Sequence, residues 1–254
     1  MALKQSEAIV LRCWPLREAD LLVTLLTRSD GRLKGVARSA MRSRKRFGGA
    51  LEPLTLVMAS WEDRERRELA RLDSCEVLVS PLTDAVDWER VAGLQHVAEV
   101  LDEALPEREV NDAVFRLAWN VVQCIKSGEV WLPVSYFDLW MVRLMGLLPA
   151  LDGCTICGRR FASDGMEPRA WFYEMADGVC CSEHKRVGSF ELTAESRGLA
   201  EGIFHTPVEQ MDASGWGEHK GADLRRFLLQ IMERHLDRRL KTGMTIASAG
   251  KALQ

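Results

Sequence analysis

Residues 31–49 read GRLKGVARSAMRSRKRFGG and combine a strand pattern with a high density of positive charge. The stretch holds seven cations and no acidic residue, although the chain of 254 residues has a net charge of −3. The cations are Arg32, Lys34, Arg38, Arg42, Arg44, Lys45 and Arg46. Such a patch predicts a binding site for a polyanion, most commonly nucleic acid, and the alternative is a solvated basic loop.

The first half of this stretch is predicted to form a strand over residues 31–38. Its cations have even numbers, whereas the odd positions hold Leu33, Gly35 and Ala37. Because successive side chains of a strand point to opposite faces, we expect the cations on one face and the small apolar groups on the other. The turn signal at residues 29–31 predicts a hairpin with an earlier strand at 20–27.

Further β-rich segments lie at residues 7–14, 53–61 and 69–78. Five short strands, with the longest interruption between the third and the fourth, predict a small closed or partly closed barrel. The oligonucleotide/oligosaccharide-binding fold (OB-fold) is the candidate with this number of strands. OB-folds bind single strands with a cationic groove and stacked aromatic rings.

Aromatic residues are sparse in this region, which limits the candidates for stacking on a base. Phe47 lies inside the basic run and is the predicted stacking residue. Trp14 and Trp61 end apolar strands and are predicted to pack in the core or at the ends of the barrel.

The pattern changes at Ser80-Pro81, after which apolar residues recur at helical spacing. Helices are predicted over residues 88–105, 110–125, 133–148 and about 221–241. The fold class is therefore predicted to be α+β: a five-stranded OB-fold barrel is followed by an all-α domain with an inserted zinc knuckle. The predicted domains are a DNA-binding OB-fold at residues 1–80 and a helical domain at residues 81–254.

Two short motifs predict a structural zinc site. Cys154-x-x-Cys157 and Cys181-x-x-His184 have the spacing at which two ligands on a tight turn converge on one Zn²⁺. Together they would supply a Cys₃His tetrahedron, in a knuckle at about residues 150–187. Cys180 is the alternative third ligand, and reduced cysteines without metal are the other interpretation of the motifs.

The main functional alternative is an enzyme, either a zinc-dependent hydrolase or a nuclease. Such an enzyme needs an open metal position near a general base, or clustered carboxylates for Mg²⁺. The sequence has no Gly-rich phosphate loop, no HExxH motif and no nucleophile elbow, so we expect no catalytic residues. No signal peptide or membrane-spanning stretch is visible, and the seven cysteines fit a reducing cytoplasm better than a disulfide framework.

The chain resembles the RecO family of bacterial recombination mediators over almost its whole length. The most specific part is EAIVLRCWPLREADLLVTLLTRSDGRLKGVARSAMRSRKRFGGALEPLTLV at residues 7–57. Four shorter segments follow: ELARLDS at 68–74, LMGLLPALDGCTICG at 144–158, GVCCSEH at 178–184 and RRFLLQIMERHLDRRLKT at 225–242. Many members of the family have four cysteines in the knuckle, whereas this chain has His184 in the last place.

The resemblance implies an N-terminal barrel, a helical domain with a zinc knuckle, and a DNA repair function. It implies binding to single- and double-stranded DNA, annealing of complementary strands, and help in loading recombinase onto DNA coated by single-strand-binding protein. The implied partners are RecR, in many members RecF, and the acidic C-terminal tail of single-strand-binding protein, in a nucleoid-associated cytoplasmic location without a membrane.

A second basic group lies on the last predicted helix. Its members are Arg225, Arg226, Arg234, Arg238, Arg239 and Lys241. They form either the solvated face of an amphipathic helix, a second DNA contact, or a seat for the acidic tail of single-strand-binding protein.

Overall fold

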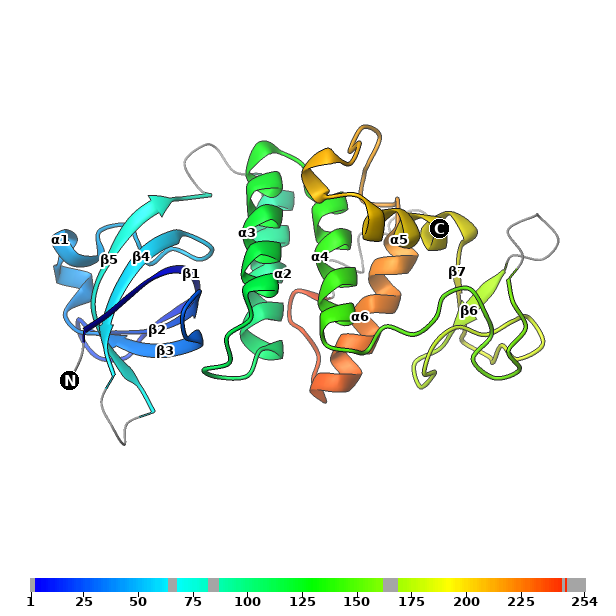
Figure 1. Cartoon of the computed structure of the whole chain (residues 1–254), viewed down its shortest axis with the longest axis horizontal. Helices are drawn as coiled ribbons and strands as arrows, with labels where there is room; N and C mark the ends of the chain where they lie inside the picture. The colour runs from blue at the N-terminus through cyan, green and yellow to red at the C-terminus, as the bar shows by residue number, and fades with distance from the viewer. Residues whose placement is uncertain (1–2, 64–67, 82–86, 162–168, 244, 246–254) are drawn as a thin grey trace. The chain divides into compact units, whose positions relative to one another are not determined.

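The computed structural model of the chain describes residues 3–63, 68–81, 87–161, 169–243 and 245. The chain divides into two compact units, residues 1–128 and 129–254 (Figure 1). The first unit holds a barrel of strands and two long helices, and the second holds the remaining helices and a small two-stranded sheet. The division into domains at residue 80 stays a prediction.

Five strands form a closed barrel in the order β1-β2-β3-β5-β4, and the chain is therefore α+β with the strands first. The strands are β1 Leu3–Pro15, β2 Leu21–Thr27, β3 Gly31–Ala37, β4 Leu56–Glu62 and β5 Ala70–Val79. Strand β1 closes the barrel because it pairs antiparallel with both β2 and β4, whereas β3 and β5 pair in parallel. The predicted strands and the predicted hairpin between β2 and β3 are confirmed.

The barrel core follows from the alternation of side chains along each strand. In β3, Leu33 and Ala37 are fully buried in the interior, while Arg32 and Lys34 are only partly covered on the outside. The predicted two faces of this strand are therefore confirmed. Trp61 of β4 is also fully buried, which confirms its predicted place in the core.

The segment between β3 and β4 contains two short helical turns, η1 Ala40–Arg42 and α1 Arg44–Phe47. Phe47 is only 4% exposed and belongs to the hydrophobic cluster inside the barrel. This one apolar side chain anchors a segment whose other long side chains are mostly cationic and exposed.

Helices α2 Trp88–Ala104 and α3 Asp112–Ser127 complete the first unit. Asn111 caps α3, because its side chain accepts a hydrogen bond from the backbone N–H of Val114 at 3.1 Å. Gly128 ends the helix with a φ of 116°, a conformation that glycine adopts without steric cost. Both ends of the helix agree with the sequence prediction to within two residues.

Helix α2 is joined to the outside of the barrel by ion pairs. The carboxylate of Asp102 lies 2.9 Å from Nε of Arg12 on β1 and 3.2 Å from Nη1 of Arg32 on β3. Glu103 accepts a further hydrogen bond from Arg12 at 3.1 Å. These side chains are at most 23% exposed, so the carboxylates of α2 neutralise cations on β1 and β3, the two strands on either side of β2.

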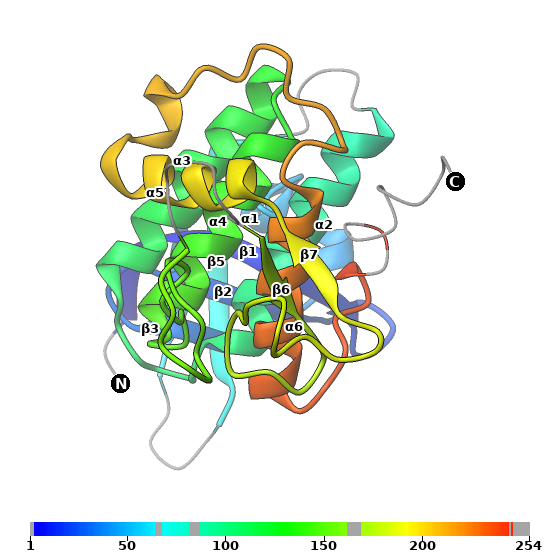
Figure 2. The same cartoon turned by 90° about the vertical axis from the view of Figure 1, so that its right-hand side faces the viewer.

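The second unit contains helices and a small two-stranded sheet, and strand β7 lies beside α6, as Figure 2 shows. Its elements are α4 Trp131–Leu144, β6 Ala170–Phe172, β7 Phe190–Leu192, α5 Ala194–His205, η2 Val208–Gln210 and α6 Ala222–Leu236. Helix α5 and the pair β6-β7 were not expected from the sequence pattern. Helix α6 ends at Leu236 rather than near residue 241, because Asp237 adopts a left-handed conformation with φ of 51°. None of the helices described is long and apolar enough to cross a membrane.

We expect Asp102→Ala to destabilise the first unit, because it leaves Arg12 and Arg32 largely buried without their shared carboxylate. The expected loss is about 2–3 kcal/mol in the free energy of unfolding, measured by urea denaturation. Asp73→Ala, at an exposed position of β5, is the matched control and should change stability by less than about 0.5 kcal/mol. Equal stability of the two variants would contradict a structural role for the Asp102 ion pairs.

Candidate functional site

The exposed cations of the predicted site follow strand β3. Arg38, Arg42, Arg44 and Lys45 are exposed, and no carboxylate of the described chain forms an ion pair with them. They lie on η1, α1 and the turn before them, a segment that begins where β3 ends. Their positive charge is therefore available to an external anion.

Arg46 differs from these four cations because its guanidinium group forms hydrogen bonds within the same segment. It donates hydrogen bonds to the backbone oxygen of Arg38 at 2.7 Å and to Oγ of Ser43 at 3.1 Å. The guanidinium carbon also lies 5.1 Å from the centre of the Phe47 ring. Arg46 therefore holds the turn that presents the other cations, while its charge remains unpaired by any described carboxylate.

Arg32 and Lys34 are neutralised inside the protein. Arg32 donates to the backbone oxygen of Leu105 at 2.7 Å in addition to its ion pair with Asp102. Lys34 lies 2.8 Å from Glu107, and this hydrogen bond is the main reason that the pKa of Glu107 is lowered. The largely buried pair of Arg32 with Asp102 weighs against Arg32 as a DNA contact, because a phosphate would have to displace a carboxylate that is already in place. The pair of Lys34 with Glu107 is a weaker obstacle, because the two side chains are 38% and 42% exposed.

The aromatic side chains differ from the sequence expectation. Phe47, the predicted stacking residue, is buried in the barrel and has no exposed face for a base. Trp14 was predicted to pack in the core or at the end of the barrel but is 53% exposed. The cause is a β-bulge in β1 between Val10 and Arg12, which reverses the alternation so that Cys13 faces the core and Trp14 faces out.

A groove of about 850 Å³ lies beside the end of β3. Its lining comes from the loop between β1 and β2, the end of β3, and the start of β5. Three cations, Arg17, Arg38 and Arg71, line it together with the carboxylates Asp20 and Glu68. Asp20 is already engaged, since its Oδ1 accepts a hydrogen bond from the backbone N–H of Ser39 at 2.8 Å. Arg17 and Arg71 were not identified from the sequence, because they are far from the basic run along the chain.

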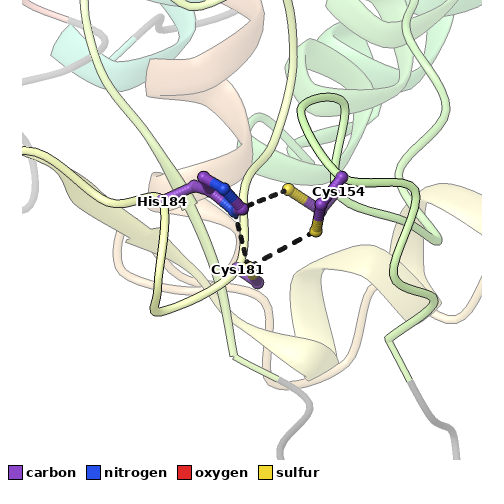
Figure 3. A group of neighbouring side chains, drawn as sticks. Cys154, Cys181 and His184 are labelled. Carbon is purple, nitrogen blue, oxygen red and sulfur yellow. Dashed lines mark hydrogen bonds between the residues drawn. The ribbon is translucent and has the colours of Figure 1, made fainter.

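The predicted zinc ligands come together in the second unit. One donor atom from each of Cys154, Cys157, Cys181 and His184 lies within 4.8 Å of the other three. Figure 3 shows Cys154, Cys181 and His184 facing one another from two separate turns of the chain. The sequence prediction therefore identified residues that the fold brings together.

The spacing of these donors fits a tetrahedral zinc ion. Zinc–sulfur and zinc–nitrogen bond lengths of about 2.3 and 2.0 Å imply donor–donor distances of about 3.5–3.8 Å. The sulfur atoms of Cys157 and Cys181 are 3.9 Å apart, and Nδ1 of His184 lies 3.2 Å from Cys181 and 3.8 Å from Cys154. Four protein donors would fill the tetrahedron, so no position is left for the water that a catalytic zinc requires.

Backbone groups near the cluster favour a thiolate at Cys154. Burial raises the pKa of this thiol, but hydrogen bonds from the backbone N–H groups of Cys157 and Cys181 outweigh burial and lower it to about 6. Cys180 is not in the cluster, and burial raises the pKa of its thiol. Its backbone instead pairs with Trp171 through two hydrogen bonds of 2.8 Å. Cys181 is therefore the third donor of the cluster.

Three of the six members of the basic group predicted on the last helix make contacts within the second unit, and the other three follow the end of α6. Arg225 is fully buried and donates to Oγ of Ser135 at 3.0 Å and to the backbone oxygen of Lys220 at 2.8 Å, so its predicted place on the solvated face is wrong. Arg226 lies over the ring of Phe190, and Arg234 donates to the backbone oxygen of Ala176 at 2.7 Å. The free cationic surface predicted for this helix is therefore much smaller in the fold.

Comparison with known proteins identifies the family on both halves of the chain. Residues 1–81 match the family model described as Recombination protein O N terminal, and residues 85–243 match Recombination protein O C terminal. The chain is 56% identical over 240 residues to the DNA repair protein RecO of Koribacter versatilis (strain Ellin345). The aligned residues cover 94% of this chain and 96% of that protein.

More distant relatives carry the same description. The DNA repair protein RecO of Syntrophobacter fumaroxidans is 35% identical over 199 residues, 76% of each chain. That of Anaeromyxobacter sp. (strain Fw109-5) is 29% identical over 248 residues, 96% of each chain. The chain described here belongs to the RecO family of DNA repair proteins.

Proposed function

We propose that this chain is a non-enzymatic recombination mediator that binds single- and double-stranded DNA and anneals complementary strands. In this role it helps to load recombinase onto DNA coated by single-strand-binding protein. Membership of the RecO family supports a function in DNA repair. The observation that carries the proposal is the group of exposed cations at Arg38, Arg42, Arg44 and Lys45, which lack carboxylate partners in the described structure.

Annealing requires two polyanions to approach each other, so neutralisation of phosphate charge is the main physical task. Lysine and arginine contacts to phosphates release condensed counterions, which makes binding favourable and dependent on salt. The barrel supplies a rigid support for these contacts, and its strand order and cationic groove support assignment to the OB-fold class. Phosphate contacts carry no sequence information, so we expect binding with little dependence on base sequence.

The zinc site has a structural role in this proposal. A bound Zn²⁺ would join two turns that are 24 residues apart at Cys157 and Cys181 and would stabilise this part of the second unit. Because all four donors come from the protein, the site supports a structural zinc rather than a zinc-dependent hydrolase or nuclease.

The proposed protein partners are those of a recombination mediator. They are RecR, RecF in an extended complex, and the acidic C-terminal tail of single-strand-binding protein, with the nucleoid in the cytoplasm as the place of action and no membrane partner. The side chain of Arg239 is 81% exposed, and its pair with Glu174 at 3.8 Å is long and solvent-exposed, so its charge is accessible to an acidic peptide.

We expect the binding of single-stranded DNA to depend on salt through the four exposed cations and Arg46. At about 0.7 counterions per phosphate contact, four or five contacts predict a log–log salt slope of about −3 to −3.5. Combined substitution of Arg42, Arg44 and Lys45 by glutamate should weaken binding at least about tenfold at low salt and reduce the slope to about −1. Fluorescence anisotropy with a labelled oligonucleotide measures both quantities, and a strand-annealing assay should show a parallel loss.

A control with the same change of net charge is available elsewhere in the chain. Arg116, Arg160 and Arg169 are exposed and already face carboxylates, so their substitution by glutamate should leave the salt slope near its original value. Equal weakening by the two triple variants would show that net charge alone drives binding. Unchanged affinity of the first variant would remove this segment from the DNA site.

Substitution of two neighbouring cysteines, one in the cluster and one outside it, tests the proposed zinc site through the metal content of the protein. Protein purified with zinc should contain about one zinc ion per chain, and Cys181→Ser should lose it because one of the four donors is replaced by a weaker ligand. Cys180→Ser is the matched control and should keep the metal. Metal analysis by mass spectrometry gives the content, and a chelator should lower the unfolding temperature of the original protein more than that of Cys181→Ser. The reverse pattern for the two cysteines would overturn this ligand set.

A further inference from the structure

The outer face of the barrel carries a row of side chains that starts at Trp14. In the strand registers, Trp14 of β1 is opposite Leu22 of β2, Leu22 is opposite Val36 of β3, and Val36 is opposite Arg71 of β5. Residues opposite each other on neighbouring strands share a face. With strands about 4.8 Å apart, the row is about 14 Å long and runs from an exposed indole to a guanidinium group.

The neighbouring positions confirm that this row faces outward. The row next to it pairs Cys13 with Val23 and Val23 with Gly35, and Val23 is fully buried in the barrel interior. Trp14, one residue further along β1, therefore points away from the core, and it is 53% exposed. A single exposed tryptophan needs no explanation by itself, but this one shares its face with a side chain that lines a groove carrying three arginines.

The structure also limits which part of the outer face is open. Arg12 lies two residues before Trp14 on β1, and Lys34 lies two residues before Val36 on β3. Arg12 forms ion pairs with carboxylates of α2, and Lys34 forms one with Glu107 in the segment that follows α2. These carboxylates exclude a polyanion from that part of the face. The row from Trp14 to Arg71 is more open, because the pair of Arg71 with Glu62 is long, at 3.8 Å, and both side chains are partly exposed, at 41% and 33%. Val36 and Arg71 line the groove together with Arg17 and Arg38.

We infer that Trp14 is a stacking platform for an unpaired base of single-stranded DNA whose phosphates lie along the groove cations. This inference rests on the proposed DNA-binding function. It adds a residue that favours single-stranded over double-stranded DNA, because only an unpaired base is free to stack on the ring. An indole ring beside cations is the combination that single-strand binders use, because every base offers a π-face while the cations hold the backbone. A base in a duplex is already stacked on both sides, so the ring would distinguish single from double strands.

The test measures the binding of three DNA ligands by Trp14→Ala and by a control variant. Trp14→Ala should weaken binding of an oligothymidine by roughly 5- to 100-fold, the range for losing one stacked base. Binding of an abasic strand of the same length, and of a duplex, should change less than about twofold, because neither offers an unpaired base. Trp88→Ala removes a tryptophan that is 65% exposed at the start of α2 and should change none of the three affinities.

Two further variants keep the test valid if Trp14→Ala is unstable. Trp14→Phe retains a ring and should keep most of the affinity for oligothymidine, whereas Trp14→Leu retains apolar volume without a ring and should behave like Trp14→Ala. An equal loss on oligothymidine, abasic strand and duplex would show that Trp14 acts only through the fold and would overturn the inference. Unchanged affinity for oligothymidine would also overturn it.

The outcome is separable from that of the proposed function. If the substitution of Arg42, Arg44 and Lys45 weakens DNA binding but Trp14→Leu does not, DNA binding by the basic segment stands and stacking on Trp14 fails. If neither variant weakens binding to any of the DNA ligands, both the proposed site and the inference fail.

Discussion

The ion pairs between α2 and the barrel decide which cations of this protein can meet a polyanion. Asp102 is shared by Arg12 and Arg32 at 2.9 and 3.2 Å, and Glu107 lies 2.8 Å from Lys34. The cations on β1 and β3 are thus paired with carboxylates within the first unit, whereas those on the turns after β3 have no carboxylate partner in the described part of the chain. The same carboxylates join the helix to the barrel. One set of contacts therefore affects both the stability of the first unit and the choice of which cations remain available to DNA.

The open surface that remains is composed of parts from several strands and turns. The basic segment supplies exposed cations, the groove adds Arg17 and Arg71, and the β1 bulge turns Trp14 outward next to them. Each part is modest by itself, since one exposed cation contributes little in water. Their combination on one rigid barrel gives a surface with both charge for phosphates and a ring for a base.

The second unit uses a different means of holding short turns in place. Its two-stranded sheet has only three residues in each strand, and the turns beside it carry the four clustered donors. Small irregular segments bury little apolar surface, so a metal ion is an effective cross-link for them. Arg225 has a comparable role nearby, because its buried guanidinium joins α6 to Ser135 of α4 and to the loop before α6.

The sequence alone determined the five strands, the first three long helices, the last helix and the zinc ligand motifs, because these depend on local periodicity and short spacing. It did not reveal α5, and it placed Phe47 in the DNA site and Trp14 in or at the end of the barrel core. Phe47 is buried and Trp14 exposed for reasons that lie in the tertiary structure: a bulge shifts the alternation of β1, and barrel closure draws Phe47 inside. The pairing of Arg32 with Asp102 of α2 and of Lys34 with Glu107 after α2 likewise joins residues about 70 positions apart, and only the folded chain brings such charges within Coulombic reach.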